Sequence, residues 1–292
     1  MTPQASRQAA KSRHAFPRSL GLATDVALIR LQHGVVERTD GQVVLRTPAN
    51  PTYHWGNCVL LERAPEPGRL ADALRAFEEA HPDAAHVAIG IDQPEVHLDP
   101  DELAAHGLQA ERDTVLTATR LVDHPRGTPA VTCRPVPVDD DAPWAALVEL
   151  EVRAEGGDDP DGHRRFVTHR YAAMRQVAAE GHGAWFAAYT DDGEPVGTLG
   201  IYRALPRVAR FQSVLTDPRI RRQGVAGALL RRAGRYALEE LGVGTLVIVA
   251  DPVGPAIGLY RAAGFADRED QWGLYRPPAV TAGPAPPTAA GR

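Results

Sequence analysis

The pattern of apolar positions is most regular in the C-terminal half of the chain. Over residues 225–241, the apolar side chains that recur at helical spacing are Val225, Leu229, Ala233, Tyr236, Ala237 and Leu241. The run GTLVIVADP (244–252) is almost continuously apolar, as expected of a strand that is covered on both faces. A third apolar run, ARFQSVLTDP (209–218), precedes the helix. Strand, helix and strand in this order predict a right-handed crossover that joins two parallel neighbours.

Other elements flank this unit on both sides. Acidic residues at 139–141 can cap the start of a helix, and Asp191, Asp192 and Gly193 mark a hairpin turn. The further elements predicted in this half are a strand at 131–138, helices at 139–156, 164–181 and 255–265, a hairpin at 184–203 and a last strand at 270–278. This pattern is typical of an α/β fold in which helices flank a mixed sheet.

The N-terminal half repeats the end of that pattern. AHVAIGIDQP (85–94) resembles the buried strand at 244–252, and the helix and strand that follow it resemble residues 255–274. The other elements expected in this half are strands at 41–48, 55–65 and 107–117 and helices at 68–82 and 99–107. We therefore predict a fold duplicated in tandem. Its predicted parts are domains at 20–122 and 131–277, a linker at 124–129 and a disordered tail at 278–292.

Composition and charge exclude several classes of function. The chain has 292 residues, enough for two domains, and its net charge of −5 argues against a general nucleic-acid binder. The two cysteines, Cys58 and Cys133, form no CxxC pair, which is typical of a reducing cytoplasm. No apolar run approaches the roughly 18 residues of a membrane span. We therefore expect no membrane partner. The histidines form no HExxH motif, so we also expect no metal.

Three arginines stand where the predicted helix begins, near Pro218. The free N–H groups of a first helical turn carry partial positive charge, so Arg219, Arg221 and Arg222 cost energy there unless an anion binds. Gly224 has no Cβ, so a phosphate group can approach the backbone closely and pair with the arginines. The alternative is that the glycine eases helix packing and the arginines are solvated. The segment contains neither GxxxxGK[ST] nor GxGxxG.

Two motifs resemble those of the GCN5-related N-acetyltransferase (GNAT) family. RRQGVA (221–226) matches the family pattern [Q/R]-x-x-G-x-[G/A]. ADPVGPAIGLYRAAGF (250–265) is similar to the family signature N-x-x-A-x-x-L-Y-x-x-x-G-F, with Val253 in place of the asparagine. The residues that match this signature are Ala256, Leu259, Tyr260, Gly264 and Phe265. The resemblance covers about residues 131–277 and implies the GNAT type of mixed sheet.

The resemblance also implies acetyl-CoA as the co-substrate. Its pantetheine arm is expected to pair with main-chain groups of the strand before the loop, at Val214, Leu215 and Thr216. Its pyrophosphate is expected on the loop itself, at Arg221, Arg222, Gln223, Gly224, Val225, Ala226 and Gly227. A main-chain N–H of the strand would polarise the thioester carbonyl, as the donors of an oxyanion hole do.

Two catalytic residues are expected, on different grounds. The resemblance implies that Tyr260 protonates the departing thiolate, although a tyrosine on an amphipathic helix is more often a core residue. In some family members a glutamate on the strand before the loop acts as the general base, but residues 210–213 of this chain contain no carboxylate. We select Glu151 as the candidate base, with a water relay as an equal alternative. The other candidates are Glu149, Asp158, Asp159, Asp161 and His163.

The first half has a different character. It lacks the coenzyme motif, so the resemblance implies a degenerate copy of the GNAT domain that has lost coenzyme binding. We expect it to complete the acceptor pocket or to stabilise the second half. Tyr53, His54 and Trp55 lie in a row beside Asn57 and either line a pocket or belong to the core.

Together, these features predict an N-acetyltransferase that transfers acetyl from acetyl-CoA to a primary amine of a small molecule by direct attack. The alternatives are a non-catalytic acyl-CoA sensor and a protein N-terminal acetyltransferase. A sensor would release no free thiol. An acceptor groove long enough for a peptide would favour the protein acetyltransferase, and a closed pocket formed with the first half would count against it.

Overall fold

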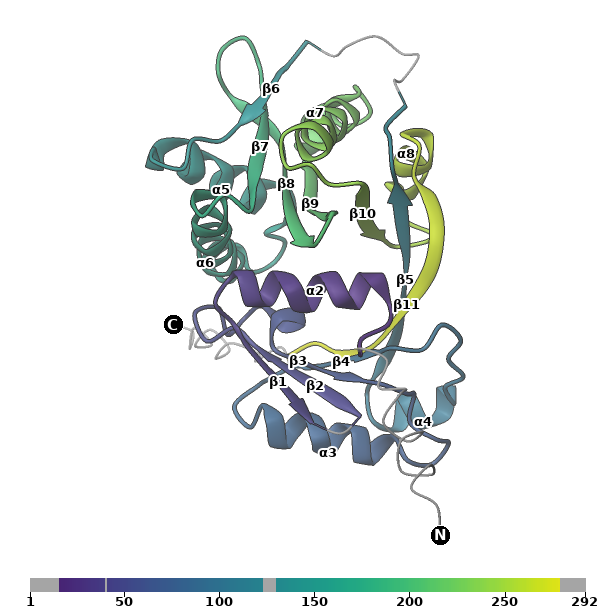
Figure 1. Cartoon of the computed structure of the whole chain (residues 1–292). Coiled ribbons are helices and arrows are strands. Elements are labelled where there is room, and N and C mark those ends of the chain that lie inside the picture. The colour runs from purple at the N-terminus through teal and green to yellow at the C-terminus, as the bar shows by residue number, and fades with distance from the viewer. Residues whose placement is uncertain (1–15, 40, 123–129, 279–292) are drawn as a thin grey trace, which may run out of the picture.

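The apolar runs of the chain pair into one sheet. The computed structural model describes residues 16–39, 41–122 and 130–278, so the predicted linker and all but one residue of the predicted tail lie outside the described residues. Within these ranges the strands form a single mixed sheet in the order β1-β2-β3-β4-β11-β5-β10-β9-β8-β7-β6 (Figure 1). No helix in the same ranges has the length and apolar character needed to cross a membrane.

The first half supplies five strands. Its elements are α2 (Leu20–Leu31), β1 (Val35–Thr39), β2 (Gln42–Arg46), η1 (His54–Gly56), β3 (Cys58–Leu61), α3 (Leu70–Ala80), β4 (Val87–Ile91), α4 (Pro100–Ala105) and β5 (Gln109–Ala118). The second half supplies the others. Its elements are β6 (Thr132–Pro135), α5 (Asp141–Glu155), α6 (Pro160–Ala179), β7 (Gly183–Tyr189), β8 (Pro195–Leu205), β9 (Val208–Thr216), η2 (Pro218–Ile220), α7 (Val225–Glu239), β10 (Thr245–Ala250), α8 (Ile257–Ala262) and β11 (Ala266–Arg276).

The two halves repeat one another in the order of their α-helices and strands. The order from α2 to β5 has its counterpart from α6 to β11, and β3 pairs with β4 in parallel as β9 does with β10. The halves also exchange their last strands. Strand β5 pairs with β10 of the second half, and β11 pairs with β4 of the first. The predicted duplication and mixed sheet are thus present, whereas the separation into independent domains at 20–122 and 131–277 stays a prediction.

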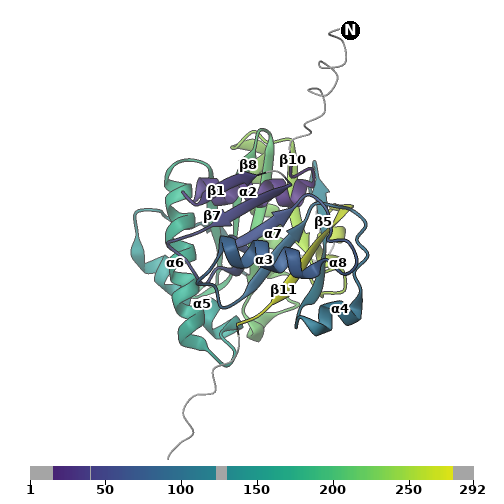
Figure 2. The same cartoon turned by 90° about the horizontal axis from the view of Figure 1, so that it is seen from below.

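Alternating burial along the strands puts helices on both faces of the sheet. In β2, Val43 and Leu45 pack in a cluster with α2, whereas Val44 packs in a different cluster with α3. In β7, Trp185 packs with α5 and α6, and Phe186 packs with α7. Figure 2 shows α3 lying across the strands of the first half. One face therefore carries α2, α5 and α6, and the other carries α3, α7 and α8.

The structure differs from the sequence predictions at two places. Helix α2 and strand β1 lie in a stretch for which no element was predicted, and α2 sits between the halves (Figure 1). The expected helix start near Pro218 is wrong, because α7 begins at Val225. Arg222 and Gly224 have φ values of 64° and 88°, which no α-helix accommodates. The arginines therefore stand in a loop before the helix.

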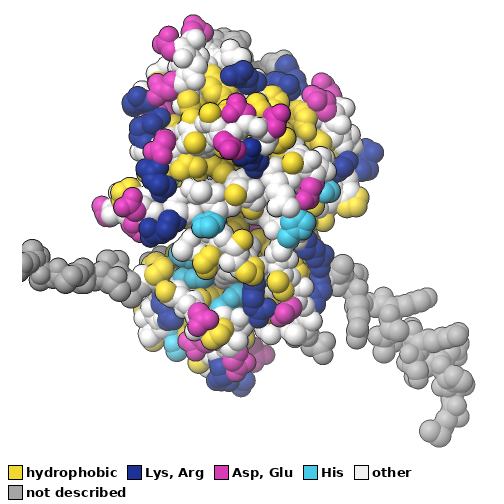
Figure 3. All heavy atoms as spheres, turned by 90° about the vertical axis from the view of Figure 1, so that its left-hand side faces the viewer, with side chains coloured by type: hydrophobic (Ala, Val, Ile, Leu, Met, Phe, Trp, Pro, Cys, Tyr) yellow, Lys and Arg dark blue, Asp and Glu magenta, His cyan; other side chains and the backbone are white. Residues whose placement is uncertain are grey.

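The division into two halves is visible on the surface of the molecule. Figure 3 shows two lobes with a waist between them, and histidine side chains lie along the waist. One of the contacts that join the halves is the pair of His33 Nε2 and Glu180 Oε1, at 3.1 Å.

Candidate active site

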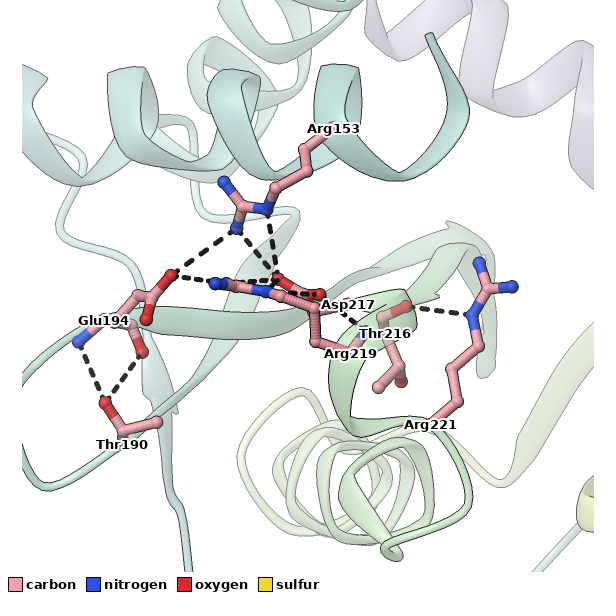
Figure 4. Close-up of polar contacts among 7 residues, drawn as sticks. All are labelled: Arg153, Thr190, Glu194, Thr216, Asp217, Arg219 and Arg221. Atoms are coloured by element: carbon pink, nitrogen blue, oxygen red, sulfur yellow. Dashed lines mark hydrogen bonds and ion pairs between the residues drawn. The ribbon is translucent and has the colours of Figure 1, made fainter. Parts of the chain in front are cut away.

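The connection between β9 and α7 is built around Asp217. This side chain is fully buried, and its Oδ1 accepts a hydrogen bond from the main-chain N–H of Arg219 at 2.9 Å. Its Oδ2 also pairs with the guanidinium groups of Arg219, at 2.7 Å, and Arg153, at 2.9 Å (Figure 4). These bonds, first of all those from Arg219, hold the pKa of Asp217 well below its usual range. Arg219 also pairs with Glu194 at 2.6 Å, so it serves the loop's own structure.

The start of α7 is open to an anion. Gly224 is the N-cap in a left-handed conformation, no side chain caps the helix, and its first turn contains no acidic residue. The main-chain N–H groups of Val225, Ala226 and Gly227 therefore point out of the helix end without intrahelical acceptors. Such groups and the helix dipole favour a bound phosphate.

Two arginines flank this helix end. Arg221 donates through Nε to the main-chain oxygen of Thr216 at 3.3 Å (Figure 4). It also pairs with Glu155 at 3.5 Å. Arg222 is exposed, and no carboxylate of the described residues pairs with it. The predicted anion-binding residues 221–227 thus lie together on one loop and the first helical turn. Gln223 belongs to the same exposed loop.

Strands β9 and β10 separate next to this loop. They pair only from Val208 to Arg210, opposite Thr245 to Val247, although β9 continues to Thr216 and β10 to Ala250. A gap therefore separates the two strands beyond Arg210 and Val247. It leaves main-chain groups around Val214, Leu215 and Thr216 unpaired on the side that faces β10.

A β-bulge shapes the same part of β9. Thr198 lies opposite Leu215 and Gly200 lies opposite Gln212, so Ser213 and Val214 share one partner position. Ser213 has a φ of 47°, the left-handed region that a non-glycine residue rarely adopts. Bulges turn main-chain groups out of the ladder and occur often beside active sites. The hydroxyl of Thr216 is buried and has no hydrogen-bond partner within the described residues. These features fit the pantetheine arm and carbonyl of an acyl-CoA.

Tyr260 lies on α8, which contacts the start of α7. A Cβ on Gly227 would lie 3.5 Å from Leu259 of this helix. Tyr260 is buried, and its burial raises its pKa to about 12. The phenol is therefore protonated at neutral pH and can act as a donor. Its ring centroid lies 6.5 Å from that of Phe265, in an edge-to-face arrangement that is also typical of a core aromatic.

The carboxylate of Glu151 already has partners within the protein. It is buried on α5, its Oε2 accepts a hydrogen bond from the hydroxyl of Tyr171, and its Oε1 lies 3.8 Å from Arg170. Burial and the charge of Glu151 raise the pKa of Tyr171 well above the usual range, so this hydroxyl keeps its proton. The carboxylate is thus held in a network between α5 and α6. Its role as a base stays a prediction.

Two other candidate bases also have structural partners. Glu149 forms an ion pair with Arg164, and Asp159 caps α6 by accepting the N–H of Gly162 at 2.8 Å. His163 differs from both, because its Nε2 is buried without a hydrogen-bond partner among the described residues.

A cavity of about 250 Å³ lies between α2 and the sheet, where the two halves meet. Arg210 and Gln212 of β9 and Val249 of β10 line it, so it borders the gap between these strands. The first half supplies most of its other polar and aromatic lining: Asp25, Tyr53, Trp55, Glu111 and Asp113. Tyr53 and Trp55, two of the aromatics noted in the sequence, therefore line a pocket. His54 instead bonds through Nδ1 to the hydroxyl of Tyr275, at 2.8 Å.

The charges in this cavity are mostly negative. Arg210 pairs with Asp25 at 3.3 Å, and Gln271 donates to Asp25 at 3.1 Å. Burial raises the pKa of Asp113, and the charges of Asp251 and Asp25 add to this effect while Arg210 opposes it. The acidic residues were not identified from the sequence. Their partners lie in the other half of the chain, so no local spacing reveals them.

The first half has no equivalent gap. Strands β3 and β4 stay paired up to Leu61 and Ile91, and Asp92 continues the contact by donating its N–H to Leu61 at 2.8 Å. A separate hollow of about 550 Å³ lies at that end, but the carboxylates of Asp92 and Glu269 there bind main-chain N–H groups at the start of α2. That the first half binds no coenzyme stays a prediction.

Comparisons with known proteins agree with this geometry. Residues 144–265 match the model of the acetyltransferase (GNAT) family. These residues form a GNAT acetyltransferase domain, as the two sequence motifs predicted. The comparison with curated proteins finds no relative of this chain.

Solved structures with the same fold extend over both halves. A GCN5-related N-acetyltransferase from Kribbella flavida has a TM-score of 0.58 at 18% identity, over 89% of this chain and 97% of that one. A conserved protein of unknown function from Staphylococcus epidermidis has a TM-score of 0.62 at 13% identity, over 83% and 94%. A GCN5-related N-acetyltransferase from Sphaerobacter thermophilus has a TM-score of 0.51 at 21% identity, over 75% and 72%. At identities this low, the structural similarity establishes the fold alone.

Proposed function

We propose that this protein transfers the acetyl group of acetyl-CoA to a primary amine of a small molecule by direct attack. The observation that carries the proposal is the gap between β9 and β10. An open helix end and the unpartnered Thr216 hydroxyl lie beside it, and an acidic cavity borders it. A site for an acyl-CoA and a site for an amine therefore meet at one place in the sheet.

The loop and the strand have separate tasks in this mechanism. Residues 221–227 would hold the pyrophosphate through main-chain N–H groups and the charges of Arg221 and Arg222. Val214, Leu215 and Thr216 would align the pantetheine arm. A main-chain N–H at the bulge would stabilise the oxyanion that forms when the amine attacks the thioester carbonyl.

Tyr260 would complete the reaction as the proton donor. The leaving thiolate takes up a proton as the C–S bond breaks, and protonation prevents its return to the carbonyl. A buried phenol with a raised pKa keeps its proton until that moment.

The cavity favours a small acceptor over a protein N-terminus. It is closed in part by α2 and β3 of the first half, through Leu22, Leu60 and their neighbours. A volume of about 250 Å³ suits a molecule of modest size. Release of free thiol with small amines would also separate an enzyme from an acyl-CoA sensor.

Charge reversal at the loop tests the coenzyme site. We expect Arg222→Glu to weaken acetyl-CoA binding about tenfold or more, because it replaces attraction to the pyrophosphate by repulsion. Isothermal titration calorimetry measures this. Gly224→Glu would also abolish binding, but a side chain at a φ of 88° strains the backbone, so Arg222→Glu is the cleaner test.

Arg232→Glu is the matched control for this test. Arg232 lies on the same helix and contacts Glu240 at 3.9 Å, beyond the end that faces the loop. Its substitution should leave the affinity unchanged. Equal affinity of the Arg222→Glu variant and the wild type would contradict the assignment of the pyrophosphate to this loop.

A further inference from the structure

Two carboxylates that line the cavity have no cationic partner among the described residues to offset the cost of their burial. Glu111 and Asp113 are alternate residues of β5, so they share one face of the sheet, and both line the cavity. Neither forms an ion pair within the described residues, whereas Arg112 between them contacts Asp270 at 3.8 Å. Burial raises the pKa of both, and the charge of Asp113 adds to the effect on Glu111. Desolvated acids in a cavity are stabilised when a cation binds beside them.

The two carboxylates stand in different surroundings. Asp113 lies opposite Gln271 in the sheet, and the charged groups that act on it are Asp251, Arg210 and Asp25. Arg210 borders the gap between β9 and β10, and Asp251 directly follows β10. Asp113 is therefore the carboxylate on the side where the thioester would lie.

Glu111 lies farther from the gap, beside an aromatic ring. Its partner in β11 is Gly273, and a Cβ at that position would come within 2.5 Å of the Trp55 ring. The missing side chain of Gly273 thus lets the indole lie directly against the sheet next to Glu111. A carboxylate beside an aromatic ring is a typical environment for an ammonium group.

We propose that this cavity binds a diamine, with the attacking nitrogen beside Asp113 and the second ammonium beside Glu111 and Trp55. This assignment rests on the proposed acyl transfer and names its acceptor. Alternate residues of a strand are about 6–7 Å apart, so the two nitrogens would be separated by a similar distance. The net charge of the lining, three carboxylates against one arginine, agrees with a dication.

In this proposal Asp113, which lines the cavity, takes the place of Glu151 as the base in the transfer. The bound ammonium gives one proton to the Asp113 carboxylate and becomes a neutral amine. Its lone pair attacks the thioester carbonyl, the C–N bond forms, and the C–S bond breaks when the oxyanion collapses. The second nitrogen proton ends on the thiol sulfur, through Tyr260 or solvent. The products are the N-acetyl amine, free coenzyme A and a protonated Asp113, which returns its proton to water.

A set of amines tests the proposal on the full chain. Thiol release is measured with α,ω-diamines of about three to six carbons and with the monoamines of equal length. We expect kcat/KM for the best diamine to exceed that of its monoamine by tenfold or more, because the second ammonium adds a charged contact worth about a factor of ten. Equal values for diamines and monoamines would overturn the diamine assignment while leaving the acyl transfer itself in place.

Two variants assign the two nitrogens. Glu111→Gln should raise KM about tenfold more for the diamine than for the monoamine, whereas the exposed control Glu79→Gln should change neither KM. Asp113→Asn should lower kcat for both amines and remove the acidic limb of the pH–rate profile. Unchanged kcat and pH profile would overturn the role of Asp113.

Binding of acetyl-CoA, measured by calorimetry on every variant, separates these outcomes from misfolding. A wild type that binds acetyl-CoA and releases no thiol with any amine would refute the proposed function itself, and the diamine site with it.

Discussion

At the scale of single residues, neighbouring arginines of one loop perform unlike tasks. Arg219 is bound to the buried carboxylate of Asp217, and Arg221 ties the end of β9 to Glu155 on α5. Only Arg222 remains exposed with no carboxylate partner among the described residues. The sequence showed that positive charge collects at this loop. It did not show that Asp217 neutralises part of it, because that depends on the packing of Arg153 from a distant helix.

Tyr260 allows a test at the same scale. We expect Tyr260→Phe to lower kcat about 10- to 100-fold with little change in KM, because the substitution removes the proton donor and keeps the ring. Steady-state thiol release measures both constants. Tyr236→Phe, in the same apolar cluster, is the matched control and should leave kcat unchanged. A Tyr260→Phe variant with full kcat would show that Tyr260 is a core aromatic.

At the scale of elements, the strands and helices of the second half follow from their apolar patterns. The start of α7 does not, because two left-handed residues and a short 3-10 turn interrupt the chain before Val225. The bulge in β9 was also invisible in the sequence. It arises from the pairing with β8, and Ser213 carries no local signal for a positive φ. Helix α2 escaped prediction because its buried residues do not form one regular stripe.

At the contact between η1 and β11, His54 bonds to Tyr275, and the protonation of His54 is expected to lower the stability of the fold in acid. Burial, and then the charge of His86, lowers the pKa of His54 to about 4. Since an unfolded histidine titrates near pH 6.5, its contribution is fully present above that pH and is lost as the pH falls towards 4. The imidazole is partly exposed, so we expect a loss of only about 1 kcal/mol between pH 7 and 5.

Denaturant unfolding at pH 7 and pH 5 measures this loss. His54→Gln keeps a hydrogen-bonding group towards Tyr275 and should lose less stability than the wild type over this interval. His97→Gln, at an exposed position, should behave like the wild type. Identical pH dependence in all three proteins would contradict the role of His54.

At the scale of the whole molecule, the exchange of strands joins the halves into one sheet. Strand β5 of the first half lies between β10 and β11, and β11 of the second half lies between β4 and β5. The same exchange carries Glu111 and Asp113 to the cavity beside β9. The first half therefore shapes the proposed acceptor site even though it lacks the coenzyme motif.

Separate production of residues 1–122 and 130–292 tests this dependence. Each fragment lacks one strand of its sheet and exposes an unpaired edge, so we expect neither to unfold cooperatively alone. Mixing the fragments should restore cooperative unfolding and acetyl-CoA binding. Circular dichroism and calorimetry measure the two properties. A fragment 130–292 that is monomeric and unfolds cooperatively alone would show that the second half is an independent domain.

The sequence by itself determined the local features of this protein. Apolar periodicity, glycine positions and two short motifs act over a few residues, and they identified the strands and helices of the second half and its GNAT domain, and they predicted the anion-binding loop. The tertiary structure alone decided which strands exchange, where β9 and β10 separate and which acids face the cavity. These features depend on contacts between residues far apart in the chain, such as Asp25 with Arg210 and Glu111 with Gly273, and no local pattern encodes them.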